Sequence, residues 1–211
     1  MPRAEKNPAR SRAPEARPAQ IIEAALDVFA EKGLADARID DIAERAGISK
    51  GTIYLYFPTK DDLFRAVIRG TVVAELERAE VARAASPDGL GLESFLTAYW
   101  RFICSPTFER VHRFLVADLP NFPDLARFYA DEVTLRGHRL VAALVQRGIE
   151  QRLYRDVDPS AAARIIMSIF VMHGVLRTKR HNLPHIAALT DEQLFDQMLD
   201  FVRAGLGASH S

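Results

Sequence analysis

The chain has 211 residues, of which 48% are hydrophobic, and its 28 basic side chains balance its 28 acidic ones. This length allows one or two domains with a sizeable core, and the net charge of zero excludes nucleic-acid binding driven by overall charge. Cys104 is the single cysteine, so the chain can form no intramolecular disulfide, which favours a reducing cytoplasm. Cys104 is then either an inert, half-buried thiol or a redox sensor.

The sequence predicts neither a membrane-spanning helix nor a secretory signal peptide. No apolar run reaches the roughly 18 residues that predict a membrane-spanning helix. The N-terminal stretch lacks the apolar region of a secretory signal peptide. We therefore expect no membrane among the partners.

Residues 1–18 hold four prolines and five basic side chains against two acidic ones. This composition predicts a disordered basic arm. Such an arm can reach the backbone or minor groove of DNA, or it can serve only as a solubilising tail.

The first predicted helix begins at Pro18, because proline suits the first helical position, and it ends at Gly33. Leu34 is then placed to contact a buried aromatic ring across the helix end. The buried stripe follows helical spacing and consists of Ile22, Ala25, Leu26 and Phe29.

Residues 39–46 and 50–57 are predicted to be two short helices joined by a tight turn. Gly47 stands where a helix end needs a positive φ, and Ser49 stands where the next helix needs an N-cap. The apolar face of the first helix consists of Ile39, Ile42, Ala43 and Ala46.

The second of these helices is unusual for a scaffold helix. Ile53 and Phe57 form only a narrow buried edge, and the other faces carry one cation, hydroxyl groups and no carboxylate. Gly51 in the first turn lowers helix stability but lets a backbone approach closely. Such a face suits the major groove of DNA, where short side chains reach base edges and hydroxyls reach phosphates. The alternative is a polar face within a helical bundle.

A longer helix begins at Thr59, with Asp62 as the partner in a capping box, and reaches about residue 85. Residues 86–91, SPDGLG, then break the helix.

Residues 20–68 resemble the DNA-binding domain of the TetR/AcrR transcriptional regulators. IIEAALDVFAEKGL is similar to the first helix of that family, and IDDIAERAGISKGTIYLYFPTKDDLF is similar to its helix-turn-helix and the start of its fourth helix. The YxYF-P-x-K ending makes the pattern more specific than a helix-turn-helix alone. The resemblance implies a bacterial, cytoplasmic protein that binds a double-stranded DNA operator.

The resemblance also implies which residues contact DNA, both near the bases and along the backbone. The implied set is Arg38, Ser49, Lys50, Gly51, Thr52, Tyr54, Leu55, Tyr56 and Lys60. Arg38 departs from the family, which usually places Thr or Ser there as a helix cap and phosphate contact. Because Arg38 cannot cap in that way, the contacts of this helix stay open, and the guanidinium can bind a phosphate itself.

From Leu92 onward every periodic segment is helical, and neither a repeat nor a strand pattern occurs. The expected helices span residues 92–105, 107–119, 124–151, 160–179 and 191–206, with a turn at 120–123 and a loop at 152–160. The stretch FLVADLPNFPDLARFYADEV resembles the AefR-like C-terminal domains of the same family.

No catalytic or metal-binding constellation occurs in the sequence. It lacks a P-loop, a nucleophile elbow, a zinc-protease helix and paired cysteines. His181 and His185 are four apart, but Pro184 between them argues against one helix, so we interpret them as a loop pair rather than a metal site. We expect no enzyme activity, no cofactor and no metal.

Aromatic and methionine residues in the second half exceed what a small bundle needs, although core packing is the default interpretation of each. The resemblance implies an apolar pocket between bundle helices for a small hydrophobic or amphipathic ligand. The candidate lining is Tyr99, Trp100, Phe114, Phe128, Met167, Phe170 and His173, the last as a polar group on an apolar helix.

A homodimer is expected, because helix-turn-helix proteins bind paired half-sites about 34–36 Å apart. The last two predicted helices are very apolar, and the resemblance implies that they form a four-helix bundle with the partner's pair. The alternative is that both are buried within one chain. The candidate interface is Ile165, Ile169, Met172, Leu176, Leu194, Phe195, Met198, Phe201 and Val202.

The sequence therefore predicts an all-α protein with an arm over residues 1–18, a helix-turn-helix DNA-binding domain over 19–66, and a helical ligand-binding and dimerisation domain over 67–211. We interpret it as a DNA-binding transcriptional regulator, most simply a repressor released from a palindromic operator by a small molecule. The alternatives are an activator, a regulator without ligand, and a helical enzyme or carrier.

Overall fold

The computed structural model describes residues 17–85, 91–177, 179 and 189–207, and these are almost entirely helical. No strand forms in the described part of the chain, where one isolated antiparallel bridge joins Tyr154 and Gly207. The predicted all-α fold is confirmed. Residues 1–16 of the predicted arm and the histidines at 181 and 185 lie outside the described residues.

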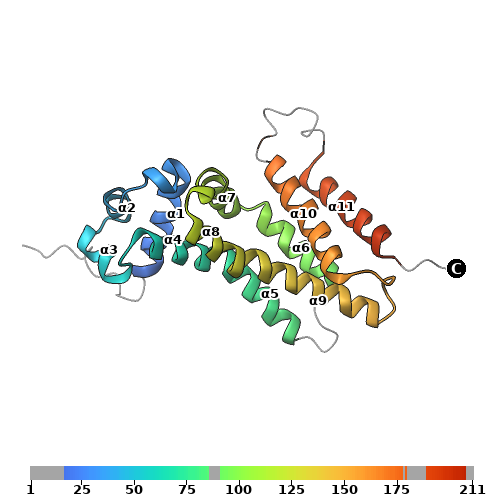
Figure 1. Ribbon diagram of the computed structural model, residues 1–211. Helices are drawn as coiled ribbons and strands as arrows, with labels where there is room; N and C mark the ends of the chain where they lie inside the picture. Colours follow the sequence, from blue (N-terminus) through green and yellow to red (C-terminus); the bar gives the residue numbers. More distant parts are fainter. Residues whose placement is uncertain (1–16, 86–90, 178, 180–188, 208–211) are drawn as a thin grey trace, which may run out of the picture.

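Four helices form a head at one end of the molecule (Figure 1). They are α1 (Arg17–Asp36), α2 (Ile39–Ala46), α3 (Lys50–Tyr56) and α4 (Lys60–Ile68). Gly33 has a φ of 81°, so α1 is interrupted where the sequence predicted its end, although the helix is resumed as far as Asp36. Ile21 is fully buried on α1, whereas the predicted Ile22 is only partly buried, so the buried stripe is wider than expected.

The helix predicted from Thr59 onward is present but contains a π-helical turn. Thr59 caps it as expected, because its hydroxyl accepts from the Asp62 N–H at 3.0 Å and its N–H donates to the Asp62 carboxylate at 3.2 Å. Helix α4 passes through the π-helical η3 (Arg69–Val73) into α5 (Ala74–Ala85). Such turns occur frequently at functional sites, and Val72 of η3 lines the cavity described below.

The second half forms a helical domain beside the head. Its elements are α6 (Leu92–Ile103), α7 (Pro106–Asp118), η4 (Leu119–Asn121), α8 (Pro123–Tyr129), η5 (Ala130–Leu135), α9 (Arg136–Glu150), α10 (Pro159–Arg177) and α11 (Asp191–Leu206). The helix predicted over 124–151 is the run from α8 through the π-helical η5 into α9, and the predicted turn at 120–123 includes part of the 3₁₀ turn η4.

One hydrophobic core extends from the head into α7 and α8. Phe29 and Phe64 both meet the ring of Phe114 edge-on, with centroids 5.7 and 5.9 Å apart, and Phe64 also meets Phe128 at 6.5 Å. A second core joins α6, α9, α10 and α11. Because both halves of the chain fill the first core, the head is packed firmly against the second domain.

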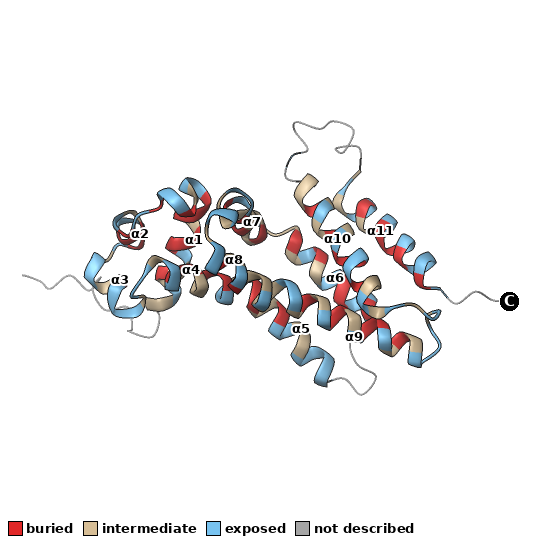
Figure 2. Ribbon diagram, viewed as in Figure 1, coloured by how far each residue is buried: buried red, intermediate tan, exposed pale blue. Residues whose placement is uncertain are grey.

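Helix α10 is strongly apolar, although much of it is not buried within the chain. By length and composition alone it could cross a membrane, so the prediction that no segment would qualify is wrong, although the core helix of a globular domain passes the same test. Helix α10 packs against α6, α9 and α11, yet only 28% of its most apolar stretch is buried. Figure 2 shows that α10 and α11 carry exposed faces, at the end of the molecule remote from α3.

Candidate nucleic-acid interface and ligand cavity

The turn before α3 is fixed by local hydrogen bonds. Gly47 adopts a φ of 64°, and its N–H donates to the Glu44 carbonyl at 3.0 Å. The Ser49 hydroxyl accepts from the Thr52 N–H at 3.2 Å and lies 2.8 Å from the Thr52 hydroxyl. The cap and the left-handed glycine therefore set the direction in which α3 leaves the turn, as the sequence predicted.

Helix α3 presents most of its surface to solvent. Ile53 is fully buried, whereas Tyr54, Leu55 and Tyr56 are 45%, 84% and 39% exposed. The helix carries no acidic residue, and Figure 1 shows it at the outer tip of the head. An exposed, acid-free helix with hydroxyl-bearing side chains suits contact with phosphates and base edges.

Lys50 stands at the start of α3, and Arg38 stands at the start of the preceding helix α2. The Lys50 ammonium donates to the Asp40 carboxylate at 2.9 Å, and this hydrogen bond raises the pKa of Lys50. Both partners are exposed, so a phosphate can compete for the ammonium. The Arg38 side chain caps nothing, as expected, and it is the Asp41 carboxylate that closes the start of α2 by accepting from the Arg38 N–H at 3.2 Å.

Lys60 is engaged within the protein rather than at the DNA-facing surface. Its ammonium donates to the carbonyls of Leu34, Ala35 and Ala37 at 2.7, 3.1 and 3.2 Å. An ammonium has three donors, so none remains for a DNA phosphate while Lys60 closes the corner between α1 and α2. The structure therefore gives Lys60 a structural role in the head. The sequence had predicted a phosphate contact for this residue instead.

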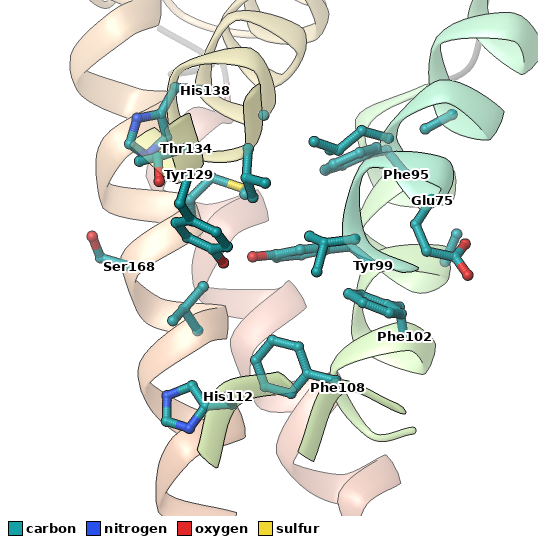
Figure 3. A pocket seen from close by; sticks show the side chains of 18 of the residues that line it. Glu75, Phe95, Tyr99, Phe102, Phe108, His112, Tyr129, Thr134, His138 and Ser168 are labelled. Atoms are coloured by element: carbon teal, nitrogen blue, oxygen red, sulfur yellow. The ribbon is translucent and has the colours of Figure 1, made fainter. Parts of the chain in front are cut away.

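A cavity of about 430 Å³ lies among η3, α5, α6, α7, α8, η5, α9 and α10. Its wall is mostly aromatic and aliphatic, as is common for small-molecule pockets of this size. Figure 3 shows the rings that surround it, from Phe95, Tyr99, Phe102, Phe108 and Tyr129.

The hydroxyls of Tyr99 and Tyr129 point toward each other within this cavity (Figure 3). In the described part of the chain neither hydroxyl forms a hydrogen bond. Burial raises the pKa of Tyr129 to about 12, and burial together with Tyr129 raises the pKa of Tyr99. Burial also lowers the pKa of His112, whose ring stacks on Phe108. At neutral pH the cavity therefore presents two protonated phenols and a neutral imidazole.

Of the seven predicted lining residues, Tyr99 and Met167 line the cavity. Phe114 and Phe128 do not, because both are buried in the core that the head shares with α7 and α8. Their rings pack on Phe64, on the side of α7 and α8 that faces α4.

Trp100, Phe170 and His173 also lie outside the cavity lining. Trp100 and Phe170 meet edge-on at 6.1 Å in the second core, and the indole N–H of Trp100 donates to the Asp191 carbonyl at 3.1 Å. Nδ1 of His173 lies 2.8 Å from the Ile169 carbonyl of its own helix. Helical spacing placed these residues on the correct helices but on the wrong faces.

Sequence reasoning missed six polar lining residues, which are Glu75, His112, Tyr129, Thr134, His138 and Ser168. Each is a polar residue within a predicted helix, which is the one signal that could have indicated them. That signal alone does not separate a cavity wall from a partly exposed surface.

Part of the predicted dimer interface is exposed. Ile165, Met172 and Phe201 are 60%, 55% and 65% exposed, and the partly buried members are Ile169, Leu176 and Phe195. A hollow of about 400 Å³ between α10 and α11 is lined by Ile165, Ile169 and Phe201 among others. Met172 also borders the cavity of about 430 Å³.

Three predicted interface residues are instead buried in their own chain. Leu194, Met198 and Val202 belong to the second core, where α11 packs on α6 and α10. Val202 also lines the hollow between α10 and α11, whereas Leu194 and Met198 do not. The broad apolar stripe of α11 therefore serves two purposes. One edge fills the core, and the other edge, with Phe201, is left outside.

Helix α7 contacts both the cavity and the head. Phe108 and His112 line the cavity. Between them, the Arg110 guanidinium donates to the carboxylates of Glu23 and Asp27 on α1 at 2.7 and 2.6 Å. Helix α7 therefore connects the cavity wall to α1 by direct contacts.

Two family models match the chain. One, described as bacterial regulatory proteins of the tetR family, matches residues 21–67; the other, described as the C-terminal domain of AefR-like transcriptional repressors, matches residues 90–181. The chain is 41% identical over 61 residues to the fatty acid metabolism regulator protein of Bacillus subtilis (strain 168), and 47% identical over 60 residues to the transcriptional regulator RutR of Escherichia coli (strain K12). These alignments cover 29% and 28% of this chain and only 31% and 28% of the two relatives.

The fold extends the likeness over most of the chain. The solved structure of the fatty acid degradation regulator FadR from Bacillus halodurans superposes with a TM-score of 0.74 at 20% sequence identity. It covers 93% of this chain and 98% of the other. At this identity the likeness concerns the fold alone.

Proposed function

The chain belongs to the TetR family of bacterial regulatory proteins, and on this basis we propose that it is a cytoplasmic, sequence-specific DNA-binding regulator of transcription. The observation that carries the proposal is the surface of α3, which is capped, acid-free and exposed at the tip of the head. The named relatives are regulators rather than enzymes, and we assign the chain no catalytic role.

In the proposed complex α3 enters the major groove. Lys50, Gly51 and Thr52 in its first turn approach base edges, and the tyrosine hydroxyls approach the flanking phosphates. A Cβ at Gly51 would meet only the Ser49 hydroxyl, at 3.8 Å, so the fold itself leaves room for a side chain there. We infer that the glycine serves close approach to DNA. The full proposed contact set is Arg38, Ser49, Lys50, Gly51, Thr52, Tyr54, Leu55 and Tyr56.

A homodimer completes the proposal, because two copies of α3 are needed to read a palindromic operator. Ile165 and Phe201 leave a contiguous apolar surface exposed on α10 and α11. Exposed apolar patches of this kind mark interaction sites. We propose that the same surface on a second copy covers it.

We further propose repression that a small molecule relieves. The cavity would hold that molecule, and α7 would transmit its binding to α1 through Arg110. The relatives with names from fatty acid metabolism align with the head only or share only the fold, so their names do not define the ligand.

Footprinting on DNA upstream of the protein's own gene and its neighbours tests the DNA-binding proposal. We expect a protected palindrome with half-sites about one helical turn apart. Gly51→Leu is the matched control, since it should leave the fold intact and remove the footprint. Absence of any protected site for the wild-type dimer would overturn the proposal, and loss of transcription from the protected promoter in a deletion strain would identify an activator instead of a repressor.

A further inference from the structure

The described cavity wall offers no lysine or arginine to pair with an anionic ligand. Among the described residues that line it, Glu75 is the one carboxylate. The Glu75 carboxylate is hydrogen-bonded to the guanidinium of Arg78, which is not part of the lining. The Glu75 side chain is 41% exposed, so solvent screens its charge, and it offers a cationic ligand only a weak partner at the edge of the cavity.

Two of the remaining polar groups are phenol hydroxyls, which can donate hydrogen bonds. Tyr99 and Tyr129 face each other from α6 and α8 and have no hydrogen-bond partner in the described part of the chain (Figure 3). Phe95, Phe102 and Phe108 lie around this pair and leave the rest of the wall apolar. Both residues line the open cavity, so a ligand that supplies an acceptor at this point can receive a hydrogen bond from each hydroxyl.

Resting on the regulatory function proposed above, we propose that the cavity selects an uncharged amphipathic ligand, with a carbonyl or ether oxygen accepting hydrogen bonds from the hydroxyls of Tyr99 and Tyr129 and an apolar body along the aromatic wall. Two phenol donors that converge on one point suit an oxygen acceptor. The surrounding rings suit an alkyl or aromatic body.

A carboxylate or phosphate ligand is disfavoured by the same wall. Moving such a group out of water carries a large desolvation cost unless a cation or several donors compensate it. His112, which faces the cavity, is neutral because burial lowers its pKa. His138, beside the exposed Thr134 at the other end of the lining, is the one further imidazole.

The test compares three probes with one alkyl body and different heads: 2-decanone, decanoate and decyltrimethylammonium. Each is added to the full-length protein, and binding is measured by calorimetry and by the shift in melting temperature at neutral pH. We expect 2-decanone to bind and stabilise the protein, with decanoate and decyltrimethylammonium at least tenfold weaker. Equal or tighter binding of either charged probe, or no binding of the ketone, would overturn the proposed ligand class.

Variants assign the binding to the tyrosine pair. The double variant Tyr99→Phe/Tyr129→Phe keeps the apolar wall and should bind 2-decanone about tenfold more weakly, as expected for two lost hydrogen bonds. Tyr154→Phe is the matched control, because Tyr154 does not line the cavity, and it should bind like wild type. Unchanged affinity in a correctly folded double variant would overturn the role of the pair.

Operator binding separates this inference from the function on which it rests. If the protein binds DNA but prefers a charged probe, the ligand class fails and the regulator stands. If the ketone binds through the tyrosine pair but no operator is found, the site stands and the regulatory function fails.

Discussion

The carboxylate of Asp118 accepts a hydrogen bond of 2.6 Å from the backbone N–H of Leu34, 84 positions earlier in the chain. This contact joins the end of α7 to the corner between α1 and α2. A Cβ at Gly33 would lie 2.7 Å from the same carboxylate oxygen, and Gly33 has a φ of 81°, so the corner requires a glycine on two grounds. Leu34 itself is buried, which leaves its N–H dependent on this partner.

Asp118→Ala should destabilise the head by about 1–3 kcal/mol, because it leaves the Leu34 N–H without its acceptor. Denaturant unfolding of the full-length protein measures this change. Asp118→Asn keeps an acceptor oxygen and should lose less stability than Asp118→Ala. Asp131→Ala removes an exposed carboxylate and serves as the control. Equal stability of Asp118→Ala and the control would show that the contact contributes nothing.

Lys60→Met should lower stability by about 1–3 kcal/mol and weaken operator binding equally for all operator variants, because three carbonyls lose a charged donor. The slope of log affinity against log salt should stay unchanged. If stability is retained while that slope falls by about 1, Lys60 binds a phosphate instead. Lys50→Met is the matched comparison, since its exposed pair with Asp40 contributes little to stability.

The contrast between Ser49 and Lys60 shows which features of the head the sequence could predict. Ser49 caps the helix that follows it within three residues, so its role is encoded locally. Lys60 reaches carbonyls 23 to 26 positions away, and that contact exists only once α1 and α4 have packed. Local turn chemistry was therefore predictable. Which basic side chains stabilise the fold and which remain available for DNA was not.

Gly51→Leu should fold with equal or higher stability, by up to about 1 kcal/mol, because leucine is the better helix former and the site has room. Operator binding should be lost, since the side chain would hold α3 away from the groove. Thermal unfolding and gel-shift titration measure the two effects separately. Gly51→Ala adds a single methyl group, and its operator affinity should fall between those of the wild type and Gly51→Leu. Wild-type affinity in a folded Gly51→Leu protein would refute the proposed docking.

Phe201→Arg and Ile165→Arg should convert the dimer into a folded monomer, because they place charge on an exposed apolar surface. Sedimentation velocity at micromolar concentration would then give the 23.6 kDa chain mass rather than twice that value. Val81→Arg is the control, at a position 68% exposed on α5, and should remain dimeric.

Met198→Arg has a different expected outcome from the surface variants. Met198 is 4% exposed within the second core, so its replacement by arginine should unfold the domain rather than divide a dimer. Circular dichroism distinguishes these results. A folded, monomeric Met198→Arg protein would show that α11 packs differently from the arrangement described above.

The cavity could be predicted from the sequence only as a general feature of the second domain. Aromatic residues at helical spacing identify helices with apolar faces, but the rotation of each helix decides which ring meets the core. Phe114 and Phe128 turn toward Phe64 in the shared core, whereas Tyr129, next in sequence, lines the cavity. Adjacent positions on one helix point about 100° apart, so a small rotation exchanges their roles.

The thirteen residues of α7 also allow a genetic test. Phe108 and His112 line the cavity, whereas Arg110 and Asp118 hold α1. In a reporter strain, substitutions of the first two should yield alleles that repress but no longer respond to inducer. Substitutions of the other two should yield constitutive alleles that have lost repression. Opposite phenotypes should thus map to alternating positions of a single helix, far from the DNA-contacting residues.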